Sequence, residues 1–212
     1  MMLTNRDKAI IKDLARFRVM DRDSIAELHF SNLKRPHLAA NNVLLRLLRD
    51  GQIQRSTKYT PYLYFGPEVQ IKKSSQKIGH FLAILNTYKE IRQHGKIESF
   101  LVEPKYGKKG GVEPDVYMYF RQTPFFIEVQ NSLYSQKQME EKLERYIDLF
   151  HSGYMAAPFP HVLILSEQRY ALDSDYPFKV FQAGTFSHFI NSMKVEQKKV
   201  QVVIKEAKIK IG

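Results

Sequence analysis

The segment VEPDVYMYFRQTPFFIEVQNSLYSQKQMEEKLERYIDLF, residues 112–150, decides the fold of the second part of this chain. Its pattern predicts two strands joined by a short turn at 121–124, followed by a long helix at 136–151. Side chains alternate between the two faces of a strand, so pairing of these strands brings Asp115 and Glu128 together at one end of a sheet. Two adjacent carboxylates repel each other unless a cation lies between them, and Mg2+ or Mn2+ prefers oxygen ligands. The pair therefore predicts a divalent-cation site.

The order of these residues resembles the motif of PD-(D/E)XK nucleases. Pro114-Asp115 lies on the first predicted strand, and Glu128-Val129-Gln130 closes the second. The resemblance covers residues 76–166 and implies an α/β (α+β) domain with a mixed central sheet and a catalytic site made of these acids. A lysine normally stands where this chain has Gln130. Lys142, on the following helix, either fills that gap as a catalytic residue or forms a salt bridge along its own helix.

The resemblance also implies a further acidic ligand on the first helix of the nuclease-like domain. That helix is predicted at 76–94, where apolar residues recur at helical spacing, and Glu90 is its only acidic residue. Glu90 is therefore either a third metal ligand beside Asp115 and Glu128 or a surface residue near the end of the helix.

Composition narrows the class of protein further. The 212 residues carry a formal net charge of +11, and residues 1–73 account for +7 of it, with 14 Lys and Arg against 7 Asp and Glu. Such an excess favours a polyanionic partner, nucleic acid above all. The chain has no cysteine, which excludes disulfides and thiolate metal sites. No apolar run approaches the ~18 residues of a membrane span, so we expect a cytoplasmic protein with no membrane partner.

The pattern of the first third of the sequence predicts a winged helix-turn-helix domain. Helical patterns at 4–18, 21–30 and 37–50 are followed by two alternating strands at 52–55 and 62–65. In such a domain the third helix enters the major groove of double-stranded DNA and the hairpin forms a wing that holds the backbone. The DNA-binding candidates on the third helix and the wing are Lys34, Arg35, His37, Asn41, Asn42, Arg55 and Lys58. A small domain of this kind that docks onto protein is the alternative.

The plan of residues 3–166 is similar to that of the replication-relaxation family of plasmid and mobile-element proteins. The residues that carry the resemblance are His80, Pro114-Asp115, Phe126-Ile127-Glu128-Val129 and Lys142-Leu143-Glu144-x-Tyr146. The resemblance implies a role in DNA relaxation, plasmid replication or mobilisation. A relaxase or a replication protein as a partner, and a homodimer, are both left open.

Two domains are expected, a DNA-binding domain at 1–70 and a nuclease-like domain at 76–212, joined by the polar stretch EVQIKKSS at 68–75. Three functions remain open at this point. The first is a DNA-binding factor that keeps a degenerate nuclease-like domain, and Gln130 favours it. The second is an active metal-dependent endonuclease or nickase, and the third is a winged-helix transcription regulator.

Overall fold

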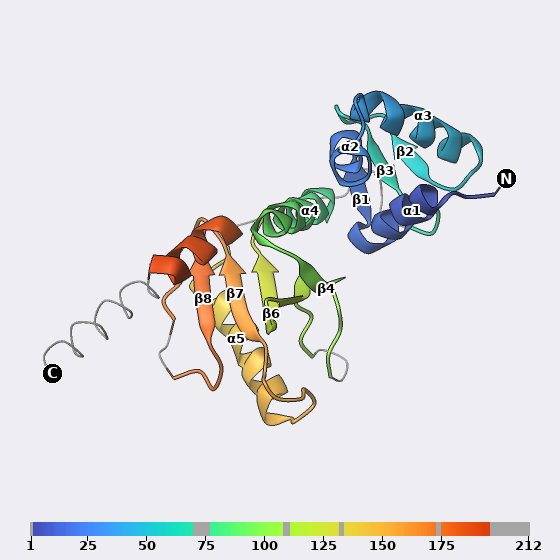
Figure 1. Ribbon diagram of the computed structural model, residues 1–212. Helices are drawn as coiled ribbons and strands as arrows, with labels where there is room; N and C mark the ends of the chain where they lie inside the picture. Colours follow the sequence, from blue (N-terminus) through green and yellow to red (C-terminus); the bar gives the residue numbers. More distant parts are fainter. Residues whose placement is uncertain (1, 70–76, 108–110, 132–133, 173–174, 196–212) are drawn as a thin grey trace, which may run out of the picture. The chain divides into compact units, whose positions relative to one another are not determined.

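The computed structural model describes residues 2–69, 77–107, 111–131, 134–172 and 175–195 (Figure 1). It is a mixed α+β protein, and its backbone contacts divide the chain into two compact units, Met1–Asn86 and Thr87–Gly212. Its elements in chain order are α1 (Asn5–Phe17), β1 (Val19–Asp21), α2 (Arg22–Phe30), α3 (Pro36–Arg49), β2 (Gln54–Ser56), β3 (Leu63–Phe65), α4 (Lys77–His94), β4 (Ile97–Val102), β5 (Val116–Phe120), β6 (Thr123–Val129), α5 (Gln136–His151), β7 (His161–Leu165) and β8 (Val180–Ala183). A helix at 186–195 follows β8.

The first unit holds α1, α2, α3, residues 77–86 of α4 and a small antiparallel sheet with strand order β1-β3-β2. The helices begin where the sequence predicts them. Thr4 caps α1 in a capping box with Asp7, and the side chain of Asp21 caps α2 by accepting from the Ser24 amide. The strand β1 was not predicted; its three residues fill the short gap between α1 and α2.

A buried acid joins two helices of this unit. Asp7 is 1% exposed, and its carboxylate accepts hydrogen bonds from the Thr4 amide at 2.8 Å and from the Arg46 guanidinium at 2.6 Å. The first bond closes the amino end of α1, and the second fastens α1 to α3. Burial opposes ionisation of Asp7, but these hydrogen bonds outweigh it, so the pKa of Asp7 lies below its ordinary value.

The second unit is built on a five-stranded mixed sheet with order β4-β5-β6-β7-β8. The strands β4, β5 and β6 are antiparallel neighbours, whereas β6, β7 and β8 run parallel. The mixed central sheet predicted from the sequence is therefore confirmed. Parallel neighbours require crossover connections, and α5 provides the one between β6 and β7.

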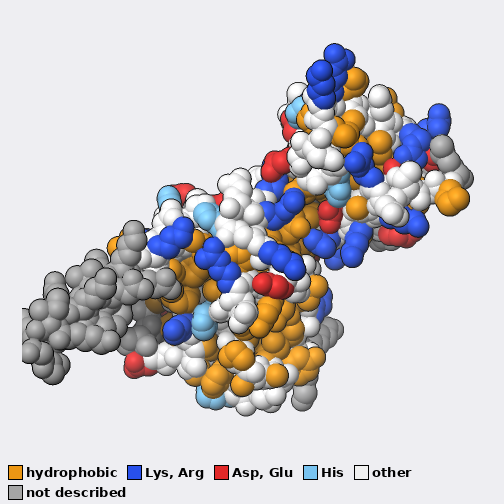
Figure 2. Space-filling view, in the orientation of Figure 1, with side chains coloured by type: hydrophobic (Ala, Val, Ile, Leu, Met, Phe, Trp, Pro, Cys, Tyr) orange, Lys and Arg blue, Asp and Glu red, His pale blue; other side chains and the backbone are white. Residues whose placement is uncertain are grey.

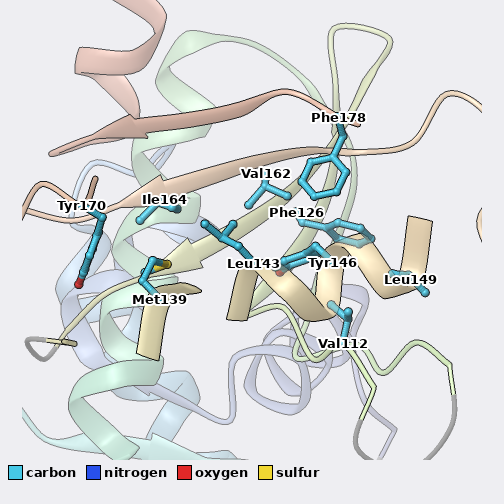
Figure 3. Close-up of a cluster of buried hydrophobic side chains, with 10 residues drawn as sticks. All are labelled: Val112, Phe126, Met139, Leu143, Tyr146, Leu149, Val162, Ile164, Tyr170 and Phe178. Carbon is cyan, nitrogen blue, oxygen red and sulfur yellow. The ribbon is translucent and has the colours of Figure 1, made fainter. Parts of the chain in front are cut away.

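Side chains of both faces of this sheet are covered by helices. The face that carries Phe126, Val162 and Ile164 packs against Leu143 and Tyr146 of α5 (Figure 3). The full cluster of buried residues on this face is Val112, Phe126, Met139, Leu143, Tyr146, Leu149, Val162, Ile164, Tyr170 and Phe178.

The opposite face meets two other helices through aromatic contacts. Phe125 of β6 and Phe181 of β8 lie 5.9 and 5.1 Å, centroid to centroid, from Phe189 of the helix at 186–195. Tyr88 of α4 meets Phe100 of β4 edge-on at 4.8 Å. Because helices cover both faces, the central strand β6 is buried along almost its whole length.

The turn between β5 and β6 is tighter than the sequence predicted. Arg121 and Gln122 alone form it, with φ of 50° and 60°, and Pro124 lies within β6 opposite Tyr119. Two consecutive residues with positive φ are typical of a type I′ turn, whose twist matches that of the paired strands. The shorter turn extends the ladder and fixes the register that places the acidic residues.

One expectation falls outside the described residues, namely most of the linker at 68–75. Within the described ranges, no helix combines the length and the apolar character needed to cross a membrane.

Replacing Asp7 by alanine is expected to lower the free energy of unfolding by about 2–4 kcal/mol, because the change removes the acceptor of the Thr4 amide in the capping box and leaves Arg46 without its anion. Urea denaturation at pH 7 measures this loss. Asp7→Asn keeps a cap but removes the charge, so it should cost less than Asp7→Ala. Equal losses in the two variants would contradict the capping role.

Candidate functional site

The two predicted acids do meet in the second unit. Val116 of β5 pairs with Ile127 of β6, and this register places Asp115 across from Glu128 at the end of the ladder. The Oδ2 atom of Asp115 accepts a hydrogen bond from the Val129 amide at 2.7 Å. Asp115 therefore holds the end of β5 against β6 as well as lying beside Glu128.

Glu128 is the most enclosed acid of the site. Its side chain is 1% exposed, and it points toward the sheet face that α5 covers. One carboxylate oxygen accepts from the Nζ atom of Lys142, and the other accepts from the hydroxyl of Tyr146. Lys142 and Tyr146 are four residues apart on α5, so one face of the helix presents both donors to the same carboxylate.

The electrostatics of this group follow from its burial. Burial and the neighbouring Asp115 raise the pKa of Glu128 to about 7, against the opposing effects of Lys142 and Tyr146. For Lys142, burial alone lowers the pKa, but attraction to Glu128 and Asp115 outweighs it and raises the value. Burial and Glu128 raise the pKa of Tyr146 well above its ordinary value, so its hydroxyl stays a donor.

Gln130 and Lys142, the two residues considered for the lysine position of the motif, have different contacts. Gln130 follows the end of β6, where its backbone N–H donates to the Leu165 carbonyl at 2.9 Å. Its Oε1 atom is buried and has no hydrogen-bond partner among the described residues. Lys142 is the cation that touches Glu128, so the structure brings this predicted residue to the site from a neighbouring element.

The site as it stands does not fit a divalent cation. Both oxygens of Glu128 already accept hydrogen bonds, and one of the donors is an ammonium group. Among the residues that the structure describes, no group of three or more His, Asp or Glu side chains could hold a metal. The positive charge beside the two acids is supplied by Lys142 instead.

Glu90 has a different place from the one predicted. Its two carboxylate oxygens accept from the amides of Phe186 at 3.3 Å and Ser187 at 2.8 Å, at the amino end of the helix at 186–195. Burial opposes ionisation, but these hydrogen bonds prevail and lower the pKa of Glu90. Glu90 is therefore a helix cap, and the prediction that it completes a metal site with Asp115 and Glu128 is wrong for this structure.

The predicted DNA-binding residues all lie in the first unit, on or near α3 and the β2–β3 hairpin. Lys34 and Arg35 are exposed in the loop that precedes α3, and Lys58 is exposed in the loop after β2. His37 is exposed in the first turn of α3, with Nδ1 3.3 Å from Asp23. Figure 2 shows Lys and Arg side chains at several places on the surface of this unit, with hydrophobic side chains between them.

A groove of about 630 Å3 separates α3 from the hairpin. Asn41 and Leu45 of α3 form one wall, and Arg55 of β2 lies over the ring of Tyr62 on the other, 4.9 Å from its centroid. Asn42 is exposed on the outward face of α3. The structure thus brings Asn41 and Arg55 together on one groove.

Two features of the sites were missed by sequence reasoning. The first is the hydrogen bond from Tyr146 to Glu128, which the four-residue spacing between Lys142 and Tyr146 could have revealed. The second is the apolar part of the groove, Leu45 and Tyr62, which looks like an ordinary helix and strand pattern in the sequence. Only the tertiary structure shows that these side chains face outward, at 57% and 45% exposure.

Comparison of the sequence with protein-family models and with curated proteins, and of the fold with solved structures, finds no match. The residues and geometry of the two sites therefore carry the functional argument.

The raised pKa of Glu128 makes its contribution to stability depend on pH. Between pH 4.5 and about 7 the folded state retains a proton on Glu128 that the unfolded chain has released. The free energy of unfolding of the wild type, minus that of Glu128→Gln, should therefore fall as pH rises through this window and level off above it. Urea denaturation at half-unit pH steps measures the difference.

Glu141→Gln, at an exposed position of α5, is the matched control and should show no such slope. A wild-type advantage over Glu128→Gln that grows with pH would mean that Lys142 dominates and that the pKa of Glu128 is lowered.

Proposed function

We propose that this chain is a DNA-binding factor of a plasmid or mobile element that acts in DNA relaxation, replication or mobilisation. In this proposal, residues 1–70 form a winged helix-turn-helix that binds double-stranded DNA. Residues 76–212 form a PD-(D/E)XK-like domain that serves as a scaffold. The resemblance of residues 3–166 to the replication-relaxation family supports the choice of process, and the net charge of +11 supports the choice of partner.

One observation carries the DNA-binding part of the proposal. The sequence of α3, PHLAANNVLLRLLR, contains no acid and ends on the exposed Arg49. Exposed cations also lie in the adjoining loops, at Lys34, Arg35 and Lys58. A helix without negative charge, bordered by cations, can approach the phosphates of a major groove without repulsion. The packing of Ala40, Leu44 and Leu47 into the core leaves the opposite side of α3 outward.

The scaffold part of the proposal rests on Glu128. Its oxygens are held by Lys142 and Tyr146, and Asp115 holds the Val129 amide, so both acids already have structural partners. Gln130 carries no charge to replace the usual lysine.

Loss of two cations beside α3 should weaken DNA binding. Lys34→Ala/Arg35→Ala is expected to reduce affinity for duplex DNA about 10-fold at low salt, and to lower the slope of log K against log salt by about 1–2, because phosphate contacts release counterions. Fluorescence anisotropy with a labelled duplex over a salt series measures both quantities.

The matched control is Arg169→Ala/Lys179→Ala, which removes the same charge from exposed positions of the second unit. Equal losses in the two double variants would show that binding depends on net charge alone and not on the surface around α3.

A metal-dependent endonuclease or nickase is the second candidate, and Lys142 favours it because this cation lies beside the two acids of the motif. The scaffold proposal predicts that pure protein binds supercoiled plasmid but leaves it intact with Mg2+ or Mn2+. Gel electrophoresis after incubation measures nicking. Nicking that disappears in both Asp115→Asn and Lys142→Met would establish the second candidate in place of the first.

A further inference from the structure

The outward face of α3 carries an ordered stripe of side chains. Leu38, Asn42, Leu45 and Arg49 follow one another at intervals of four, three and four residues, which places them on one side of a helix. Leu38 is 51% exposed and Leu45 is 57% exposed. The stripe therefore presents an apolar group, an amide, a second apolar group and a guanidinium in a row.

The two leucines take no part in the core of the unit. The buried side of α3 consists of Ala40, Leu44 and Leu47, on the other side of the helix axis. Large apolar side chains at half exposure or more are few in the described part of this unit, namely Met2, Leu38 and Leu45, with Tyr62 close to that level. Leu38 and Leu45 are two turns apart on one helix, so they form a single surface feature.

The surroundings of the stripe fit a nucleic acid. Arg49 continues the stripe, Arg35 precedes the helix, and Arg55 stands across the groove, whereas α3 itself has no acid. This charge is complementary to phosphate. The nearby acids are paired with cations, Asp23 of the groove with Arg22 and Asp50 with Arg49. The amide of Asn42, between the leucines, has the donor and acceptor pair that binds adenine N7 and N6 in the major groove.

The major groove of DNA offers one apolar feature to a protein, the 5-methyl group of thymine. At 1.5 Å of rise per residue, Leu38 and Leu45 are roughly 10 Å apart along the helix, about three base-pair steps of 3.4 Å. Two leucines at this separation can meet two thymine methyl groups while the amide between them meets an adenine.

We propose that α3 reads A·T base pairs, with Leu38 and Leu45 against thymine methyl groups and Asn42 on adenine. This inference rests on the proposed DNA-binding function and adds the sequence class that the helix selects. The cations around α3 supply affinity for any duplex, and the stripe supplies the preference among sequences.

The test uses two alternating copolymer duplexes, poly(dA-dT) and poly(dA-dU), which differ only in the thymine methyl group. The wild type should bind poly(dA-dT) more tightly, by about 4-fold for one buried methyl group and about 16-fold for two. Competition against a labelled duplex, measured by fluorescence anisotropy, gives the ratio of the two affinities.

The double variant Leu38→Ala/Leu45→Ala should bring that ratio close to one while it retains affinity for poly(dA-dU), because no charge changes. Leu38→Met/Leu45→Met keeps apolar groups and should preserve most of the preference, and circular dichroism checks that both variants are folded. Leu101→Ala, at a 49% exposed leucine of β4, makes the same chemical change elsewhere and should leave the ratio unchanged.

Three results would overturn the inference, and they can be told apart. Absence of binding to either copolymer would refute the DNA-binding function itself. Equal wild-type affinities, or a preference that survives in Leu38→Ala/Leu45→Ala, would refute methyl readout by α3 and leave DNA binding intact. Equal affinities for the two copolymers, together with a wild-type dimer that is lost in the double variant when measured by sedimentation, would assign the leucines to a protein interface.

Discussion

The contact between the buried carboxylate of Glu128 and two donors from α5 fixes how the second unit is assembled. Glu128 lies on the central strand β6, where water is excluded, so its charge must be balanced from within. Only a helix that turns Lys142 and Tyr146 toward the sheet can do this. That requirement sets the rotation of α5, and the same rotation carries Leu143 and Met139 into the apolar cluster on this face. Polar and apolar packing thus specify one orientation.

Each of the two units contains a buried acid that is paired with a cation. Asp7 in the first unit and Glu128 in the second are each 1% exposed, and each is bonded to a cation of another element, 39 residues away for Asp7 and 14 for Glu128. The outcome for the pKa differs, since Asp7 has several hydrogen bonds that favour its anion, whereas Glu128 has a second acid beside it. The pKa of Asp7 lies below its ordinary value, so Asp7 stays ionised at neutral pH. The pKa of Glu128 is about 7, so its carboxylate binds a proton near neutral pH despite the adjacent Lys142.

Much of this fold could be predicted from local patterns. The bounds of α5 agree with the sequence prediction, and so do the pairing of Asp115 with Glu128 and the approach of Lys142, because periodicity and strand alternation act over short distances. The role of Glu90 could not be predicted, since its partners lie about one hundred residues further along the chain. The outward position of the Leu45 side chain could not be predicted from the sequence either, because a leucine in an amphipathic helix is expected to face the core.

The structural duties of Asp115 bear on how such motifs evolve. Its carboxylate closes the ladder between β5 and β6 through the Val129 amide, while Glu128 anchors α5. Selection for a stable fold would therefore retain both acids whether or not the domain acts on DNA. The presence of the Pro-Asp and Glu pair alone would then not indicate an active nuclease, and the residue at position 142 would be the more informative one.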